Sequence, residues 1–578
     1  MKNDEIAGLF ERMGHLLEIK GENVFKVRAY EKAAENIRTC GEDIEILRQD
    51  NRLGEIAGLG KALKEKIGEY LDTGQVQAYQ QLLKEIPQSV LEMVDVPSVG
   101  PKKAKLFFER LNLRSLDDLD RAVRAGALTG LPGIQSRTVE NIRKGIETVR
   151  AGQQRMNLGQ AAETAGRIMA ILKECRQARQ VAVAGSLRRM KEEVGDIDIL
   201  AVSDKPDAVM DAFVRGPQVK QVLAYGPTKL SVLTSENVQA DLRVVDGDSF
   251  GAALLYFTGS KGFNVKLRQL AVRKKMRINE YGIFAVGGKK EKRLAGKTER
   301  ECFAVLGFPE IPPELREDIG EKRLFTGHRP KVPALVERGD IRGDGHVHSR
   351  WSDGKDSIGD LARAAAEKGY AYIGISDHSA SLRVAGGLTE AALKKKKAEI
   401  AAVNRRQKKV RVLYGTEVEI DKQGHLDYNE RILKEFDLVI AAIHSVFDQG
   451  REQLTRRLEA ACRHPYVDVI AHPFCRHFGK REPLDIDFDR ICRLAAETGT
   501  ILEINAFPVR LDLDSVRIFH AQPHGVRFMI NTDAHRVDQL DFMEYGVGLA
   551  RRGWLTKQDV VNTYPLKKFL SSLKRHVK

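Results

Sequence analysis

The stretch VAVAGSLRRMKEEVGDIDILAV, residues 181–202, predicts two β-strands joined by a Gly-Ser turn, with paired acids on the second strand. Polar and apolar residues alternate where that strand begins, which is typical of a strand with one buried face. Asp196 and Asp198 are two residues apart, so their side chains project from the same face. Two adjacent carboxylates repel each other unless a cation lies between them. The stretch therefore predicts a mixed α/β domain that binds a divalent metal ion.

A third acid follows on a later strand. Asp241 lies in VQADLRVV, residues 238–245, whose alternating pattern predicts a strand able to lie beside the first. Three such acids suit two-metal phosphoryl transfer, in which one ion activates an attacking hydroxyl and both stabilise the in-line transition state. The turn before the acids offers Gly185, Ser186 and Arg189 as partners for a triphosphate. A surface strand with two solvated acids is the alternative interpretation.

The Gly-Ser turn and the DxD pair together resemble the nucleotidyltransferase signature of family X DNA polymerases. Downstream, LLYFTGSKGFN (254–264) resembles the nucleotide pocket of that family and INEYGIF (278–284) resembles its thumb. Lys261 departs from the pattern, because relatives often carry an acid there. The resemblance implies Mg²⁺ or Mn²⁺ at Asp196, Asp198 and Asp241, and nucleotide contacts from Gly185, Ser186, Arg189, Gly195, Tyr256, Phe257, Gly259 and Asn264. Tyr256 and Phe257 would stack on the sugar and base, and Asn264 would contact the base edge. A terminal or non-templated transferase is the competing class.

Length and composition limit the class of protein. The 578 residues are enough for three or four domains, and 42% hydrophobic residues are too many for a disordered chain. No apolar run approaches the ~20 residues that span a bilayer, and MKNDEIAGLF has no signal-peptide pattern. We therefore expect a cytoplasmic protein at the nucleoid DNA, with no membrane attachment. Six scattered cysteines without a CxxC pair predict neither a disulfide framework nor a thiolate zinc site.

The formal net charge of +15 is concentrated in one region. Residues 1–150 carry 24 basic and 24 acidic side chains, whereas residues 260–300 carry 13 and 3. Such a stretch predicts a surface that follows nucleic-acid phosphates, and a solvated helical face is the alternative. We expect DNA, as a gapped or primer–template duplex, and dNTPs as partners of a monomer.

Three segments in the first 150 residues combine a Gly-rich turn with a following helix: IAGLGKALKEKI (56–67), VPSVGPKKAKLF (96–107) and LPGIQSRTVENI (131–142). A helix N-terminus presents unpaired N–H groups, and glycine lets a phosphate approach them. The segments resemble helix-hairpin-helix motifs, although Ser98 replaces the first glycine of the second and Gln135 the second glycine of the third. For the third segment, a purely structural role is the alternative. The predicted DNA-binding residues are Gly58, Gly60, Val99, Gly100 and Lys102.

Residues 25–74 also resemble the small lyase domain of family X polymerases. FKVRAYEKAAENI precedes the first hairpin, and the family places a Schiff-base lysine in the helix after it, which corresponds to Lys66. A lysine amine attacks a sugar aldehyde only in its unprotonated form, which the nearby Lys61 and Lys64 favour electrostatically. An ordinary surface lysine is the alternative interpretation.

The last third of the chain repeats one construction, in which an apolar run ends and a metal-competent residue follows. Eleven of the 14 histidines lie between residues 340 and 540. The predicted ligands are His346, His348, Asp353, His378, Glu417, His444, His472, Asp533 and His535. The ends of parallel strands meet at one face of a barrel, so separate segments can form one site. Nine nitrogen and oxygen ligands suit two or three Mn²⁺, Zn²⁺ or Fe ions.

This pattern resembles the PHP domain, named for polymerase and histidinol phosphatase, which is a distorted (β/α)7 barrel. The resemblance implies a metal-dependent phosphoesterase, with Asp377 and Glu419 as supporting residues beside two ligands. For any single histidine, a hydrogen-bonded core residue is the alternative, and that alternative does not account for the whole set.

Together these observations predict a multidomain α+β and α/β chain. We expect a helical lyase-like domain with a helix-hairpin-helix at 1–80, helix-hairpin-helix fingers at 81–150, a nucleotidyltransferase palm at 151–245, a thumb at 246–315, a linker at 316–340 and a PHP domain at 341–578. This order resembles the bacterial and archaeal type of family X DNA polymerase. It implies gap filling in base excision repair with a Mn-dependent 3′–5′ exonuclease. Relatives also show 3′-end cleaning and abasic-site endonuclease activity. Alternatives are a PHP domain that is only a structural metal module, a DNA-end-binding scaffold and a small-molecule phosphatase.

Overall fold

The computed structural model describes residues 2–40, 44–56, 58–94, 96, 98–153, 155–286, 292–317, 319–320, 322–325 and 332–574. Parts of the basic stretch at 287–291 and of the expected linker at 326–331 lie outside this set. No helix among the described residues is both long and apolar enough to cross a membrane.

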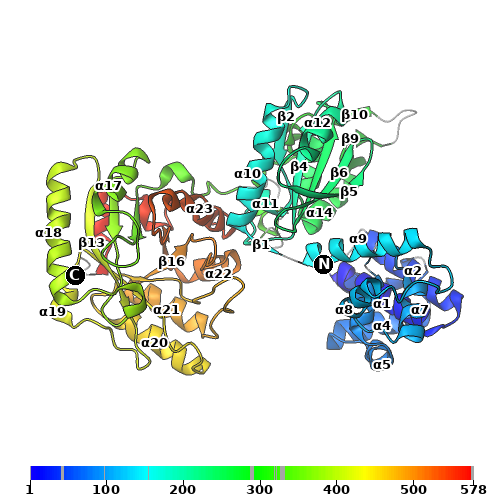
Figure 1. Ribbon diagram of the computed structural model, residues 1–578, viewed down its shortest axis with the longest axis horizontal. Coiled ribbons are helices and arrows are strands. Elements are labelled where there is room, and N and C mark those ends of the chain that lie inside the picture. Colours follow the sequence, from blue (N-terminus) through cyan, green and yellow to red (C-terminus); the bar gives the residue numbers. More distant parts are fainter. Residues whose placement is uncertain are drawn as a thin grey trace. The chain divides into compact units, whose positions relative to one another are not determined.

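The N-terminal region is helical (Figure 1, blue to cyan). Its helices are α1 (Lys2–Lys20), α2 (Val24–Thr39), α3 (Ile44–Gln49), α4 (Lys61–Thr73), α5 (Gln77–Glu85), α6 (Gln88–Val94), α7 (Pro101–Leu111), α8 (Leu116–Arg124) and α9 (Ser136–Gln153), with a 3₁₀ turn at Leu53–Glu55. One hydrophobic core runs from Ile6 to Ile146. The three predicted turns precede α4, α7 and α9, so each predicted hairpin helix is present.

The middle region contains the two strands predicted from the opening stretch, labelled β2 and β4 in Figure 1. A five-stranded sheet has the order β2-β4-β7-β6-β5, which makes β7 the hydrogen-bonded neighbour of β4. Its elements are β1 (Met156–Asn157), α10 (Leu158–Glu174), β2 (Gln180–Val183), α11 (Gly185–Arg188), β3 (Glu193–Val194), β4 (Asp196–Val202), α12 (Pro206–Val214), β5 (Val219–Tyr225), β6 (Lys229–Thr234) and β7 (Gln239–Val245). β2 pairs antiparallel with β4, and β1 with β3.

A smaller three-stranded sheet, β10-β9-β8, follows in the chain. Its elements are α13 (Phe250–Thr258), α14 (Lys261–Arg273), β8 (Met276–Asn279), β9 (Gly282–Ala285), β10 (Lys292–Ala295) and α15 (Glu299–Leu306). Ser260 and Thr298 cap α14 and α15 by accepting hydrogen bonds from Phe263 N and Glu301 N. Short helical segments follow at Pro313–Leu315, Lys322–Phe325 and Arg338–Asp340.

The C-terminal region is a seven-stranded parallel sheet in the order β11 to β17. Val347 bridges in parallel to Ala534, which brings the last strand back to the first and nearly closes a barrel. The strands are β11 (Gly343–Val347), β12 (Tyr372–Ile375), β13 (Arg411–Glu419), β14 (Leu438–Ala442), β15 (Val469–Ile470), β16 (Ile501–Asn505) and β17 (Arg527–Asn531). Nearly every strand residue is buried, as expected for parallel strands covered on both faces.

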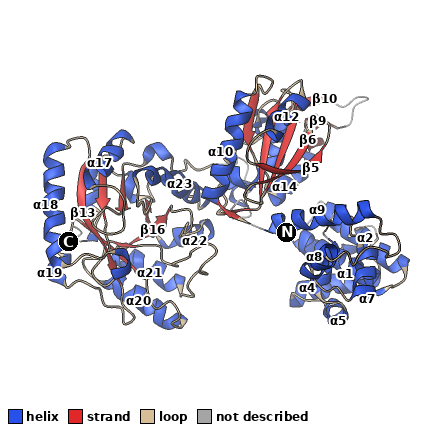
Figure 2. Ribbon diagram, in the orientation of Figure 1, coloured by secondary structure: helices blue, strands red, loops and turns tan. Residues whose placement is uncertain are grey.

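Helices alternate with these strands and lie outside them (Figure 2). They are α17 (Ile358–Glu367), α18 (Glu390–Arg406), α19 (Glu430–Leu433), α20 (Arg451–Arg463), α21 (Phe488–Thr498), α22 (Ser515–Ala521), α23 (Met543–Arg552) and α24 (Leu566–Ser571), with 3₁₀ turns at Arg383–Ala385, Gln522–His524, Val537–Phe542 and Val561–Thr563. The predicted fold class, including the distorted (β/α)7 barrel, is confirmed.

Candidate functional sites

The three predicted carboxylates lie on neighbouring strands of the five-stranded sheet. Asp196 and Asp198 lie at the start of β4, and Asp241 lies on β7. Burial and the negative charges of Asp196 and Asp241 raise the pKa of Asp198 to about 7. Partial loss of solvent and the charge of Asp241 also raise the pKa of Asp196. Lys229 Nζ, 3.3 Å from Asp241 Oδ2, is a nearby cation. The carboxylates of Asp196, Asp198 and Asp241 repel one another, which fits a site that holds a divalent cation.

The Gly-Ser turn packs directly on the second carboxylate. Gly185 has φ +64°, and a Cβ there would lie 2.3 Å from Asp198 Oδ2. Both the backbone conformation and the close approach therefore require glycine. Ser186 Oγ is buried and has no hydrogen-bond partner in the part of the chain that the structure describes. An unpaired hydroxyl in the turn beside Asp198 is compatible with a ligand oxygen, and the role of Ser186 in nucleotide binding stays a prediction. Gly195 directly precedes Asp196, with open space around its Cβ position.

The two arginines of the turn are held by protein groups. Arg189 Nε lies 2.6 Å from Glu317 Oε1, and its Nη1 donates to the Thr258 carbonyl. Arg188 makes a bidentate pair with Glu299, at 2.9 and 2.6 Å. Sequence reasoning missed Glu299 and Glu317, because no local motif marks a partner more than 100 residues away.

The predicted nucleotide-pocket residues lie together at the end of α13. The Tyr256 and Phe257 rings form an edge-to-face pair with centroids 5.1 Å apart. Arg268 lies over Tyr256 at 5.7 Å and Arg243 over Phe257 at 5.1 Å, and neither arginine was predicted. Asn264 Nδ2 donates to the Tyr256 carbonyl at 2.6 Å. Gly259 has φ +70° and ends α13.

The hairpin turns share one backbone geometry. Gly58 and Ser98 have φ of +80° and +72°, so Ser98 takes the left-handed conformation of the glycine that it replaces. Gly60 and Gly100 precede α4 and α7, and a Cβ at either would meet no atom within 4 Å. These helix N-termini are therefore open to a phosphate.

The remaining predicted residues of the N-terminal region are placed as follows. Lys102 is exposed on α7, whereas the Val99 side chain is buried and its N–H bonds to the Val96 carbonyl. Lys66 lies on α4 and is half-buried, with Nζ 3.4 Å from the Ala62 carbonyl. Its role as a lyase residue stays a prediction.

All nine predicted ligands of the barrel lie at or just after the carboxyl ends of strands and form one buried cluster around Glu417. Its Oε1 lies 2.9 Å from His472 Nε2 and 3.1 Å from His444 Nε2. Its Oε2 lies 2.9 Å from His378 Nδ1 and 3.3 Å from His346 Nε2. Segments that follow different strands therefore converge on one carboxylate, as expected for a barrel face.

Three subsets of the nine have ligand atoms within 4.8 Å of one another. They are His348, Asp353, His378 and His535; His346, His348 and Asp533; and His378, Glu417 and His444. Several buried imidazole nitrogens, among them Nδ1 of His348 and Nδ1 of His472, lack a hydrogen-bond partner within the described residues. Burial lowers the pKa of His348 and His472 to about 4, so both rings are neutral and able to coordinate. The donor set fits two or three metal ions.

Carboxylates hold two of these histidines in place. Glu419 Oε2 lies 2.8 Å from His444 Nδ1, as predicted for a supporting residue. Glu503 Oε1 lies 2.7 Å from His346 Nδ1 and was missed, although it lies on β16, the one strand to which no ligand was assigned. Asp377 was the other predicted supporting residue. It pairs with Lys396 Nζ at 2.9 Å and accepts a hydrogen bond from Ser349 N at 2.7 Å.

Arg510 also lies at the cluster and was not predicted. Its Nε is 3.2 Å from Asp533 Oδ2. A guanidinium beside a group of metal ligands is well placed to attract a phosphate.

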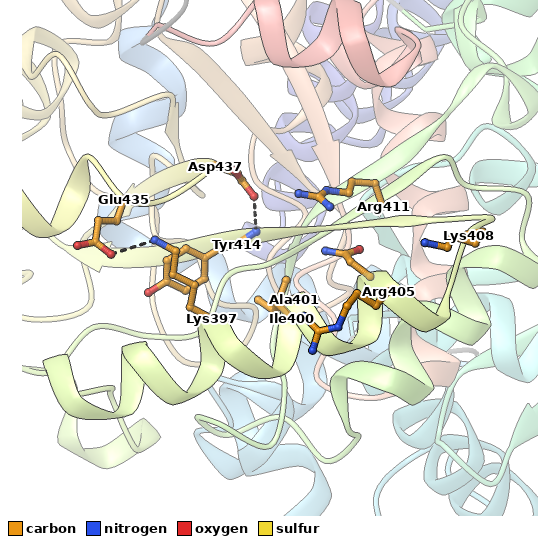
Figure 3. A pocket seen from close by; sticks show the side chains of 10 residues that line it. Lys397, Ile400, Ala401, Arg405, Lys408, Arg411, Tyr414, Glu435 and Asp437 are labelled. Atoms are coloured by element: carbon orange, nitrogen blue, oxygen red, sulfur yellow. Dashed lines mark hydrogen bonds and ion pairs between the residues drawn. The ribbon is translucent and has the colours of Figure 1, made fainter.

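A cavity of about 420 Å³ lies elsewhere on the barrel (Figure 3). It is lined in part by Arg405, Lys408 and Arg411, while Lys397 pairs with Glu435 at 3.0 Å. β13 begins at Arg411 and carries Glu417 near its other end, so the cavity is separate from the metal-ligand cluster.

Comparison with known proteins agrees with this arrangement. Family matches cover a helix-hairpin-helix domain at residues 1–76, a DNA polymerase beta thumb at 253–317 and a PHP domain at 344–506. The DNA polymerase/3′-5′ exonuclease PolX of Bacillus subtilis (strain 168) is 37% identical over 578 residues, all of both chains. A probable phosphatase of Thermoanaerobacter sp. (strain X514) is 29% identical over 40% of this chain and 96% of its own.

DNA polymerase lambda of Rattus norvegicus is 24% identical over 54% of this chain and 56% of its own. The phosphatase and polymerase lambda thus each match only part of this chain, whereas the Bacillus protein matches throughout. The chain therefore belongs to the PolX type of family X DNA polymerases, which carry a C-terminal PHP domain.

Proposed function

We propose that this chain fills short gaps in DNA during base excision repair, and that its PHP barrel removes nucleotides from 3′ ends in a Mn-dependent reaction. As a PolX-type enzyme, the chain is a DNA-directed DNA polymerase and a 3′–5′ exonuclease. The observation that supports the proposal is that one chain carries two separate groups of candidate metal ligands: the interacting carboxylates around Asp198 and the histidine-rich cluster around Glu417. One suits joining phosphodiesters and the other suits hydrolysing them.

In the polymerase site, Asp196, Asp198 and Asp241 would hold Mg²⁺ or Mn²⁺. Bound there, the metal would activate the primer 3′ hydroxyl and offset the charge that develops on the transferred phosphate. Ser186 offers its unpaired hydroxyl to a phosphate oxygen, and the Gly185 turn fixes its distance from Asp198. Tyr256 and Phe257 would stack on the sugar and base of the incoming nucleotide.

In the barrel, the nine ligands would hold two or three Mn²⁺, Zn²⁺ or Fe ions, which would polarise the phosphate and activate water. Arg510 would bind a phosphate oxygen of the 3′ end. Glu419 and Glu503 keep His444 and His346 oriented. The same centre suits abasic-site endonuclease and 3′-end cleaning. Lys66 remains our candidate for a 5′-deoxyribose-phosphate lyase.

DNA binding would come from the exposed N-termini of α4 and α7 and from the basic stretch at residues 260–300. Both features suit contacts with the phosphate backbone, which are independent of base sequence.

The first experiment is a gel assay on a 5′-labelled primer in a one-nucleotide gap with Mn²⁺, with and without the four dNTPs. Extension with dNTPs and 3′ shortening without them are expected. Extension alone would make the PHP domain a structural module, and shortening alone would make the chain a nuclease on a polymerase scaffold.

Two double variants test whether the sites are independent. Asp196→Ala with Asp198→Ala should abolish extension and leave 3′ shortening intact, because the metal ligands of the barrel are untouched. His346→Ala with His348→Ala should have the opposite effect. Loss of both activities in either folded variant, measured in the same gel assay, would contradict the two-site model.

A further inference from the structure

Arg552, at the end of α23 of the barrel, reaches the turn of the polymerase site. Its Nη1 donates to the Arg189 carbonyl at 2.9 Å and lies 3.2 Å from Glu317 Oε1. Its Nη2 lies 3.6 Å from Glu192 Oε2. Only 3% of Arg552 is exposed, so its charge is balanced by these partners rather than by water.

Glu317 joins the two arginines into one buried network. The same Oε1 atom lies 2.6 Å from Arg189 Nε and 3.2 Å from Arg552 Nη1. Burial alone would raise the pKa of Glu317, but the two guanidinium groups lower it below its ordinary value. Glu192 is likewise held by Arg552 and accepts a hydrogen bond from Ser515 N at 2.8 Å. Removing Arg552 would leave two carboxylates buried without this cation.

Helix α23 also packs closely against the end of the polymerase turn. A Cβ at Gly548 would lie 2.8 Å from Met190 Cγ, and Met190 itself has φ +55°. The helix backbone therefore packs directly on the residue that follows Arg189, and there is no room for a larger residue at position 548.

This network ends at the nucleotide pocket. Arg189 Nη1 donates to the Thr258 carbonyl, one residue after Phe257. At the other end of the turn, Gly185 packs on Asp198. The position of the turn therefore sets the distance between the metal-binding carboxylates and the nucleotide pocket.

We infer that Arg552 is a positioning residue for DNA synthesis, through which the PHP barrel holds the polymerase turn at residues 185–190 in its productive geometry. This inference rests on the proposed polymerase function. If the turn shifts by about 1 Å, its groups no longer meet the triphosphate in the productive geometry, and reactions are sensitive to displacements of that size.

The test compares Arg552→Met with Arg551→Met in the full chain. Arg551 is the matched control, because it lies on the same helix but pairs with Glu314 at 2.6 Å. In steady-state filling of a one-nucleotide gap, Arg552→Met should raise the KM for dNTP about tenfold, while 3′ shortening without dNTPs stays within about twofold. Arg551→Met should leave both within about twofold. Arg552→Lys keeps the positive charge without the planar guanidinium, so its KM for dNTP should lie between those of the wild type and Arg552→Met.

Hydrogen exchange of amides 184–195 gives a readout that needs no activity. Exchange should be faster in Arg552→Met than in the wild type, and unchanged in Arg551→Met. If Arg552→Met does not fold, Gly548→Ala tests the packing of α23 on the same turn, because it places a methyl group against Met190. If the wild type does not extend the primer, the proposed function fails, and the exchange rates still decide whether Arg552 holds the turn.

Two outcomes would overturn the inference. One is an unchanged KM for dNTP and unchanged exchange in Arg552→Met. The other is a parallel fall of synthesis, 3′ shortening and thermal stability in both Arg552→Met and Gly548→Ala, which would make Arg552 a general structural residue.

Discussion

Gly185 shows how much of the polymerase site depends on a single residue. Its φ of +64° and the 2.3 Å that would separate a Cβ from Asp198 Oδ2 strongly favour glycine at this position. We expect Gly185→Ala to lower the free energy of unfolding by about 2 kcal/mol, because of the left-handed backbone and the clash. We expect primer extension to fall at least about 100-fold, because Asp198 must move. Urea unfolding and the gap-filling assay measure the two effects.

Gly166→Ala is the control for this change. Gly166 lies inside α10, and a Cβ there would meet no atom within 4 Å. Alanine at this helical position should raise stability by up to about 1 kcal/mol and leave extension unchanged. Normal extension by Gly185→Ala would show that Asp198 does not depend on this close contact.

Among the elements, the hairpin helices are those predicted to bind the DNA backbone. α7 begins after Gly100, and Lys102 is exposed in its first turn, where the dipole and free N–H groups also favour a phosphate. We expect Lys102→Ala to weaken binding to gapped duplexes of any sequence. The slope of log K against log salt should become shallower by about 1, the value for one phosphate contact. Fluorescence anisotropy at several salt concentrations measures this slope.

Lys84→Ala provides the comparison, because Lys84 is an exposed lysine in the last turn of α5, outside the hairpin turns. It should leave the slope unchanged. An equal change in both variants would mean that α7 has no special contact and that only overall charge matters.

At the scale of the whole molecule, the candidate metal ligands connect most of the barrel, because they lie at or after the ends of six of its seven strands. Ions that bind only the folded state stabilise it, by about 2.7 kcal/mol at 100 times Kd. We expect a chelator to lower the Tm of the barrel by about 5–10 °C and Mn²⁺ to restore it. Differential scanning calorimetry measures the shift without reference to activity.

Two double variants make this result specific. His346→Ala with His348→Ala should remove the response to Mn²⁺. His520→Ala with His524→Ala should keep most of it, because those histidines form a separate and largely exposed group with Asp489, outside the buried cluster. If neither the chelator nor Mn²⁺ changes the Tm of the wild type, the barrel does not bind metal as proposed.

Short-range patterns in the sequence were enough to predict the paired acids and the candidate ligands at the ends of apolar runs, and the resemblance to the PHP domain implied the barrel. Residues two apart on a strand share a face, so the spacing of Asp196 and Asp198 alone pairs their side chains. The metal-competent residues at the ends of apolar segments likewise predicted that nine side chains converge at strand ends, in the barrel that the resemblance implied. Ser98 shows the limit, because its left-handed conformation, that of a motif glycine, is visible only in the folded chain.

The pairing of distant groups depends on the tertiary structure alone. Arg552 and Arg189 are 363 residues apart in sequence, and Glu317 joins them without any motif of its own. Glu503 beside His346 and Arg510 beside Asp533 are of the same kind. The physical reason is that periodicity and turn chemistry act over a few residues. A buried charge pairs with an opposite charge that the tertiary packing places within about 3 Å, whatever the distance between the two in sequence.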